Sequence, residues 1–285
     1  MSAGVTLTGL GVLILASLTP ALIYVSWVRS SERYRADPWG RILAAFAYGA
    51  VFATIVAGLL ELALVSAGTA ASQAYPAPEF TFLNGNSTVG AFFLVLVLAP
   101  LVEEGLKAYG VVQREDDIKV VADGPVFGAS VGLGFGFFET FLYGVAGYLA
   151  GGLAAGLALV LVRSISSVLL HGSTTAMFGY GYAISKLEKS PGATGGYYLL
   201  AVLMHATFNA LASLGAILVA LGFSNTVGGY ADALGLLVAI AFAISAINHV
   251  ISVIHRTSFP AAGGSLRYSP PSIARRPPNP PAPPR

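Results

Sequence analysis

Long apolar stretches follow one another along the chain with little polar sequence between them. Seven are long enough to count as candidate membrane spans, at roughly 5–28, 41–67, 88–112, 125–149, 153–185, 196–221 and 229–255. A helix needs about 20 apolar residues to cross the hydrocarbon core of a bilayer. Only 10% of the 285 residues are charged, against about 25% in soluble domains, so this chain cannot cover a water-facing surface. The pattern predicts an all-α, polytopic bundle of about seven transmembrane helices in a lipid bilayer.

The same low charge excludes a soluble enzyme, a nucleic-acid-binding protein and a disordered chain. We expect one transmembrane helical domain over 1–256, with a catalytic core at about 88–221. The fifth stretch is longer than one crossing requires, so we expect it to begin as a tilted or interfacial segment near Gly151 and Gly152. The end of the chain, 257–285, is rich in proline and arginine. It is expected to be an extended, disordered cytoplasmic tail near anionic lipid headgroups, or alternatively a docking site for a partner.

The basic residues predict the orientation in the membrane. With seven alternating spans, every one of the 15 basic residues except Arg163 falls on the same side. The loops predicted on the other side, 68–87, 150–152 and 222–228, contain none. Because basic residues concentrate in cytoplasmic loops, we predict an external N-terminus and a cytoplasmic C-terminus, in a multi-pass protein of the cell membrane.

A few ionisable residues lie inside the predicted spans, where each costs roughly 2.5–3.5 kcal/mol on the insertion scale. Three glutamates and two histidines fall at comparable depth in four successive spans, which favours a shared functional site over scatter. The intramembrane polar residues of interest are Glu61, Glu103, Glu104, Glu139, Arg163, His171 and His205, with the companion Asn209.

Two of these acids are adjacent, in "APLVEEGLKAYG". Neighbouring residues on an ideal helix project about 100° apart, so Glu103 and Glu104 are not expected to aim at one point. Glu103 and Lys107 lie four residues apart on one face, in the favourable order for an ion pair. Lys107 is expected to reach the cytoplasmic water, whereas Glu103 is too deep to do so. Pro100, one turn earlier, should bend the helix and turn the carboxylates toward a cavity.

The next span carries a smooth face and a deep acid. Its glycines recur every four residues from Gly128 to Gly136, which lets another helix approach closely. Glu139 then lies near mid-membrane. It is either a functional group or the partner of Arg163 in a buried ion pair. For Glu61, near the outer end of the second span, a structural pairing with Arg163 is expected.

His171 and His205 complete the set, and His205 has Asn209 one turn further on. A partly desolvated glutamate can act as a general base on water, and imidazole and amide donors can stabilise a developing oxyanion. These parts match amide hydrolysis. The same residues would also suit a proton- or cation-coupled transporter, and an inactive membrane scaffold is the third alternative. For the enzyme, the Glu103 carboxylate is expected within about 8 Å of His205, with room for a water between them.

In this order the motifs resemble the PrsW family of intramembrane proteases, part of the wider group of CAAX prenyl proteases and bacteriocin-processing enzymes. The resemblance is carried by "EEGLK", "FGFFETFLY", His171 and "HATFN" and covers about 100–210. It implies cleavage of a membrane-anchored protein substrate. It makes Glu103 the general base, Glu104 its support in holding water or a metal, and His205 with Asn209 the oxyanion donors.

Glu139 stands where the CAAX branch has a histidine, which favours the PrsW branch, and His171 is the candidate replacement for that histidine. His171, His205 and Glu139 form a candidate set of metal ligands, because two histidines and a carboxylate can hold Zn²⁺ with a position left open for water. The His-x-x-x-His spacing of zincins is missing. A glutamate mechanism without a metal therefore stays equally open.

Overall fold

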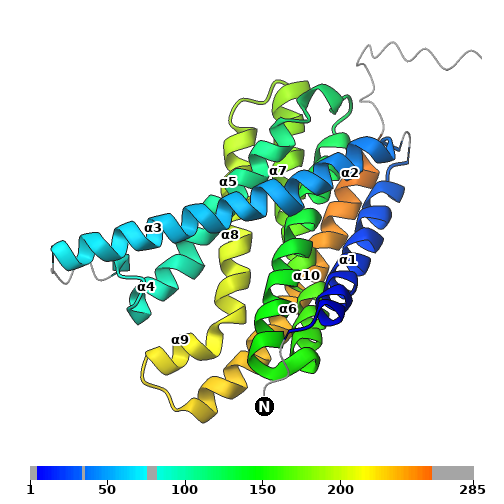
Figure 1. Ribbon diagram of the computed structural model, residues 1–285. Helices are drawn as coiled ribbons and strands as arrows, with labels where there is room; N and C mark the ends of the chain where they lie inside the picture. The colour runs from blue at the N-terminus through cyan, green and yellow to red at the C-terminus, as the bar shows by residue number, and fades with distance from the viewer. Residues whose placement is uncertain (1–4, 34–35, 76–81, 259–285) are drawn as a thin grey trace, which may run out of the picture.

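A computed structural model describes residues 5–33, 36–75 and 82–258, and within them all regular structure is helical (Figure 1). The helices in chain order are α1 (Leu7–Ser30), α2 (Trp39–Ala47), the π-helix η1 (Tyr48–Ala53), α3 (Thr54–Ala74), α4 (Thr88–Phe93), the π-helix η3 (Leu94–Leu98), α5 (Ala99–Val112), the short 3₁₀ turn η4 (Glu115–Asp117), α6 (Asp123–Ile165), α7 (Ser167–Leu187), α8 (Ala193–Ala212), α9 (Leu214–Ala220) and α10 (Asn225–Thr257). The predicted all-α class is confirmed.

Several of these elements join end to end into longer rods. Helices α2, η1 and α3 form one continuous rod from Trp39 to Ala74, and α4, η3 and α5 form another from Thr88 to Val112. By length and composition, five described segments can cross a membrane, or six if the bent pair α8 and α9 counts as one span. The chain is therefore a multi-pass membrane protein, and seven crossings and their orientation stay predictions.

One of the five segments, 123–187, is longer than a single crossing because the chain folds back inside it. Gly152 has φ +81° and ψ 177°, which breaks α6 into two arms, and this positive φ is open to glycine and strained for other residues. Gly156 in the second arm lies against the carbonyl of Gly144 in the first, so the two arms form a hairpin. The expectation of a special segment near Gly151 and Gly152 thus corresponds to a tight reversal. A second break, at Ser166, separates α6 from α7.

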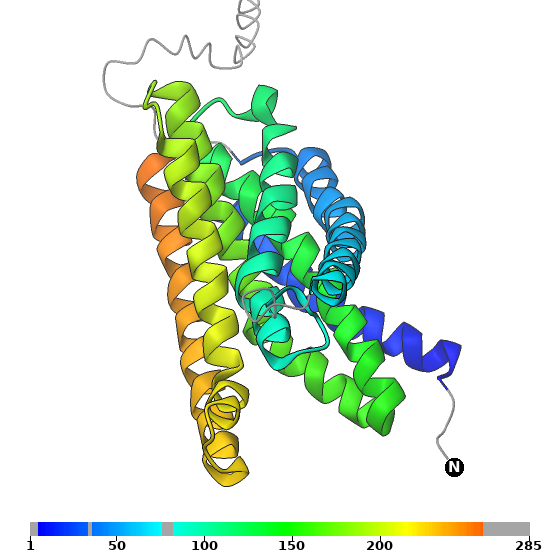
Figure 2. The ribbon, with the colours of Figure 1, turned by 90° about the vertical axis from the view of Figure 1, so that its left-hand side faces the viewer.

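The first arm of α6 is the centre of the bundle. It packs against α1, α2 and α7, and Figure 2 shows the tip of the hairpin beside the beginning of α1, where the backbone amide of Thr6 donates to the Tyr148 hydroxyl at 3.3 Å. A side chain at Gly132 would collide with the carbonyl of His171, and one at Gly128 with that of Thr175. The glycine face predicted from the sequence therefore lies where α7 comes closest.

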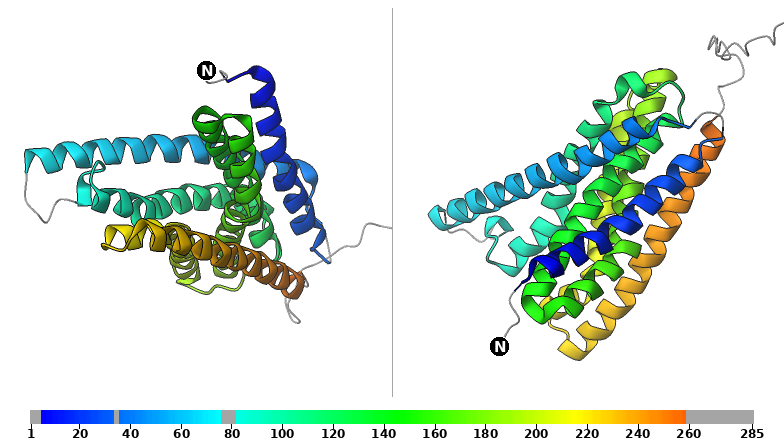
Figure 3. Two further views of the ribbon diagram at one scale, coloured as in Figure 1. Left: turned by 90° about the horizontal axis from the view of Figure 1, so that it is seen from below. Right: turned by 45° about the vertical axis from the view of Figure 1, so that its right-hand side comes forward.

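The two rods extend to one side of this centre. Seen from below, α3 and the α4–α5 rod run beside each other away from α6, with α9 and the start of α10 on the same side (Figure 3). Helix α8 bends by 68° into α9, and α10 packs along α7, α8 and α9. The tail expected over 257–285 lies outside the described residues, apart from Thr257 and Ser258.

Candidate active site

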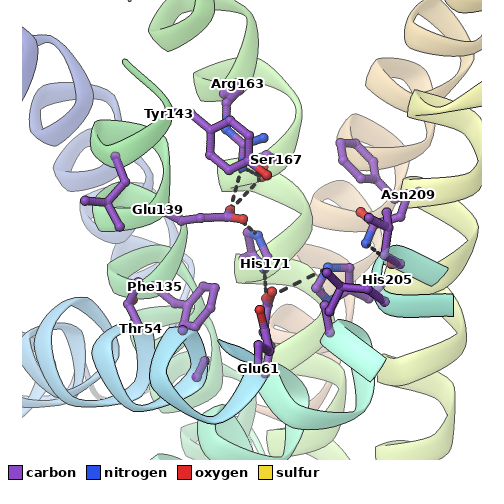
Figure 4. Close-up of a pocket in the computed structure, with 18 residues that line it drawn as sticks. Thr54, Glu61, Phe135, Glu139, Tyr143, Arg163, Ser167, His171, His205 and Asn209 are labelled. Atoms are coloured by element: carbon purple, nitrogen blue, oxygen red, sulfur yellow. Dashed lines mark hydrogen bonds and ion pairs between the residues drawn. The ribbon is translucent and has the colours of Figure 1, made fainter. Parts of the chain in front are cut away.

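Four helices bring the predicted site residues to one cavity of about 290 Å³. Helix α5 contributes Glu103 and α6 contributes Glu139, while α7 brings His171 and α8 brings His205 and Asn209. Figure 4 shows His171 between Glu139 and His205. Glu104 does not line the cavity and contacts the His205 ring from behind. The six candidate residues therefore form one connected cluster.

Glu103 is the carboxylate that faces both imidazoles. Its side chain is almost fully buried, and its Oε2 lies 3.9 Å from His205 Nε2 and 3.9 Å from His171 Nδ1. The separation expected between Glu103 and His205 is thus confirmed. Oε2 accepts no hydrogen bond from the described residues. A buried carboxylate oxygen without a donor indicates a place for water or a cation.

Glu104 holds the opposite side of the His205 ring. Its Oε1 lies 2.9 Å from His205 Nδ1 and also accepts from Thr174 Oγ1 at 3.0 Å. A carboxylate only accepts hydrogen bonds, so Nδ1 carries the hydrogen and Nε2 is turned toward Glu103. Glu103 and Glu104 were not expected to aim at one point, yet they flank the same imidazole from its two nitrogens.

The tautomer of His171 is fixed by its two neighbours. Its Nε2 lies 2.9 Å from Glu139 Oε2, and its Nδ1 lies 2.9 Å from Lys107 Nζ. The carboxylate must accept and the ammonium must donate, so Nε2 bears the hydrogen while Nδ1 presents a lone pair. Both histidines therefore have one nitrogen oriented by a carboxylate, as metal-binding histidines commonly do.

Lys107 corrects one expectation. It does not extend to the cytoplasmic water, because its side chain is 0% exposed. Its Nζ donates to Glu104 Oε1 at 2.7 Å, lies 3.7 Å from Glu103 Oε2 and sits 4.5 Å from the centre of the Phe135 ring. The pairing expected four residues apart with Glu103 is present, but the shorter contact is with Glu104, three residues away. Two adjacent acids and an internal histidine hold the ammonium inside the bundle.

Glu139 forms the ion pair that the sequence left as its alternative role. Arg163 Nη2 donates to Glu139 Oε2 at 2.5 Å and to Ser167 Oγ at 2.8 Å, and its guanidinium stacks on the Tyr143 ring at 3.8 Å. The Glu61 pairing expected for Arg163 is therefore wrong. Glu61 lines the cavity instead, because the hairpin at Gly152 returns Arg163 to the level of Glu139.

Asn209 lies on the cavity wall, but its amide has a partner within the protein. Its Nδ2 donates to the backbone carbonyl of Val95 in η3 at 2.8 Å. Sequence reasoning paired Asn209 with His205 as oxyanion donors because they lie one turn apart. It could not foresee the Val95 contact, which depends on how α8 packs against η3.

Three buried residues have ligand atoms close enough to share a metal ion. Glu103, His171 and His205 each offer one atom, and these atoms lie within 4.8 Å of one another. The sequence-based set had Glu139 in the place of Glu103. Glu139 instead orients His171 and neutralises Arg163. The unpaired Oε2 of Glu103 and the two carboxylate-oriented imidazoles fit a divalent ion such as Zn²⁺.

The charges around the cavity agree with this fit. In their ionised forms, four carboxylates (Glu61, Glu103, Glu104 and Glu139) face the two cations Lys107 and Arg163. The excess of two negative charges equals the charge of one divalent cation. Sequence reasoning missed Lys107 and Thr174 as members of this cluster. The signal was there, because each lies three residues after a residue already chosen, Glu104 and His171.

Comparison with known proteins agrees with the motifs. Residues 37–251 match the family described as PrsW family intramembrane metalloprotease. The chain is 26% identical over 204 residues to Protease PrsW of Clostridioides difficile (strain 630), covering 69% of this chain and 77% of that protein. It is 27% identical over 177 residues to Protease PrsW of Geobacillus kaustophilus (strain HTA426), covering 61% and 67%. No solved structure matches significantly.

Proposed function

The chain belongs to the PrsW family of intramembrane metalloproteases and is a membrane-embedded peptidase, and we propose that it hydrolyses a peptide bond in a membrane-anchored protein with water activated by Glu103. The observation that supports this role is the position of the Glu103 carboxylate. Its Oε2 is buried, has no hydrogen-bond donor among the described residues and faces two oriented imidazoles at 3.9 Å.

In the proposed reaction Glu103 moves a proton twice. It accepts a proton from water while the water oxygen adds to the substrate carbonyl carbon. When the C–N bond breaks, Glu103 returns that proton to the departing amine, so the products are a new carboxyl terminus and a new amino terminus. A carboxylate among packed helices suits this task, because it has no bulk water to displace it.

His205 is the proposed donor to the oxyanion. Glu104 holds its Nδ1 at 2.9 Å, which sets the ring plane and keeps Nε2 on the cavity side. Ring orientation fixed in advance lets a donor stabilise developing charge without reorganising. Glu104 acts behind His205 and Glu139 acts behind His171, so each acid supports a different imidazole.

A bound divalent metal would polarise the substrate carbonyl and lower the pKa of water. Glu103, His171 and His205 would hold it. Their second partners (Glu104 on His205, Glu139 on His171) are the carboxylates that fix the ring orientations.

The substrate is proposed to be a protein anchored in the same bilayer, most simply the cell membrane. Support comes from the lining of the cavity, where the polar groups of α5 to α8 adjoin apolar residues of the two rods, among them Ala57, Leu94 and Ala99. A substrate segment arriving from the lipid would meet this apolar wall first. The motifs also favour membership of the wider CAAX protease and bacteriocin-processing group.

The direct test is Glu103→Gln in the purified full-length protein, assayed on a single-pass membrane reporter in proteoliposomes. Losing the base should reduce cleavage about a hundredfold or more, while the unfolding temperature in detergent stays close to that of the wild type. Glu188→Gln, at an exposed glutamate beyond the end of α7, is the matched control and should cut normally. A transporter or an inert scaffold would not cleave the reporter in either form. Cleavage by Glu103→Gln at the wild-type rate would refute the assignment.

A further inference from the structure

The π-helical segment η3 leaves one backbone carbonyl without its helical donor. At the end of η3 the amide of Ala99 donates to the carbonyl of Leu94, five residues back. The next bond in this series would run from residue 100 to the carbonyl of Val95. Residue 100 is proline, which has no N–H to donate. In a membrane, no water from the lipid side can replace the missing bond.

Asn209 supplies the missing donor from another helix. Its side-chain Nδ2 donates to the Val95 carbonyl at 2.8 Å. Eleven residues earlier on the same helix α8, the Tyr198 hydroxyl donates to the carbonyl of Leu101 at 2.9 Å. Helix α8 therefore holds the α4–α5 rod on both sides of Pro100.

This rod carries the proposed general base. Glu103 lies one turn beyond Pro100, and Leu94 and Val95 in η3 form part of the cavity wall. A change in the bend at Pro100 would rotate Glu103 relative to His205, which sits on the helix that also carries Asn209. The contact at Val95 therefore links the direction of the carboxylate to the helix that holds its imidazole partner.

We propose that Asn209 is a positioning residue whose amide replaces the N–H that Pro100 lacks, and thereby fixes the bend that aims Glu103 at His205. The inference rests on the proposed role of Glu103. It departs from the oxyanion role expected for Asn209, because the amide acts on a carbonyl of the protein itself and not on the substrate.

The two roles are separated by a double-mutant cycle between Asn209→Leu and Pro100→Ala. Alanine at 100 restores a backbone N–H, so it removes the need for the amide. Asn209→Leu alone should lower kcat about tenfold with KM changed less than about threefold. In the Pro100→Ala background the same substitution should lower kcat by less than about threefold.

A matched control comes from Asn248→Leu. The amide of Asn248 donates at 2.9 Å to Ile244 on its own helix α10, at a position away from Pro100 and the cavity, so this variant should keep the wild-type kcat in both backgrounds. An equal loss from Asn209→Leu in both backgrounds would mean direct contact with the substrate and would overturn the proposal. No loss in either background would overturn it as well.

The same cycle read by thermal unfolding in detergent is independent of catalysis. Asn209→Leu should lower the unfolding midpoint clearly in the Pro100 protein and much less in Pro100→Ala. Equal shifts would contradict the replacement of one donor by another, including in the case where Pro100→Ala is inactive by itself. Failure of the proposed function would instead appear as cleavage by Glu103→Gln, which leaves the unfolding cycle unaffected.

Discussion

Lys107 holds its ammonium against two of the three candidate metal ligands. It lies 2.9 Å from His171 Nδ1 and 3.7 Å from Glu103 Oε2. An ion bound by these atoms would take over the lone pair of His171 and repel the ammonium at short range. The lysine and a metal therefore compete for the same donors, and Lys107 balances part of the acidic charge when no metal is bound.

We expect Lys107→Met to bind Zn²⁺ about tenfold more tightly or better, because a repelling charge and a competing hydrogen bond are both removed. Competition between metal-stripped protein and a zinc indicator measures this affinity. Zinc should also raise the unfolding temperature of the variant more than that of the wild type. Lys119→Met, at an exposed lysine, is the control. Unchanged zinc affinity in Lys107→Met would contradict the competition.

At the level of single residues, sequence reasoning found which side chains matter better than it found their partners. The glutamates and histidines were identifiable because each is costly in an apolar span. The burial of Lys107 and the pairing of Arg163 with Glu139 depend on how helices far apart in the chain rotate and cross. Spacing along one helix does not contain that information, so Glu61 was given the wrong partner.

Among the elements, the contact between α6 and α7 controls the position of His171. The glycine at 132 allows the backbones to approach until its own Cα faces the carbonyl of His171. Such contacts tolerate no additional atom, because the opposing group is backbone and cannot rotate away.

Gly132→Ala should therefore separate α6 from α7, lower stability by about 1–3 kcal/mol and reduce cleavage by displacing His171 from Glu103. Unfolding in detergent and the reporter assay measure the two effects. Gly11→Ala in α1 is the control, since a Cβ there meets no atom within 4 Å, and it should behave like the wild type. Normal activity and stability in Gly132→Ala would show that the two helices have slack at this point.

The elements show equally well where sequence patterns stop being informative. The rod from Thr88 to Val112 coincides with the predicted span 88–112, because apolar length alone defines it. The reversal at Gly152 was recognised only as an irregularity. A glycine pair is compatible with a kink, a tilt or a hairpin, and the choice is made by the packing of Gly144 against Gly156.

For the whole molecule, the predicted orientation has a simple test because the chain contains no cysteine. Single cysteines at Gln73, at the end of α3, and at Glu188, beyond α7, are both exposed. In intact cells, a membrane-impermeant maleimide should label Gln73→Cys and should label Glu188→Cys only after permeabilisation. The unmodified protein is the blank. The reverse labelling pattern would invert the topology and place the tail outside the cell.

The depth of the cluster has a consequence for any protein that is cut here. Glu103, His171 and His205 are each at least 93% hidden by their own helices. An intact helix is about 10–12 Å across and keeps its carbonyls bonded along its axis, sheathed by its side chains. Such a cylinder cannot bring a backbone carbonyl to groups recessed this far. The scissile stretch has to uncoil first, so susceptibility to cutting should follow how easily a target's helix melts locally, more than the chemical identity of the residues beside the cut.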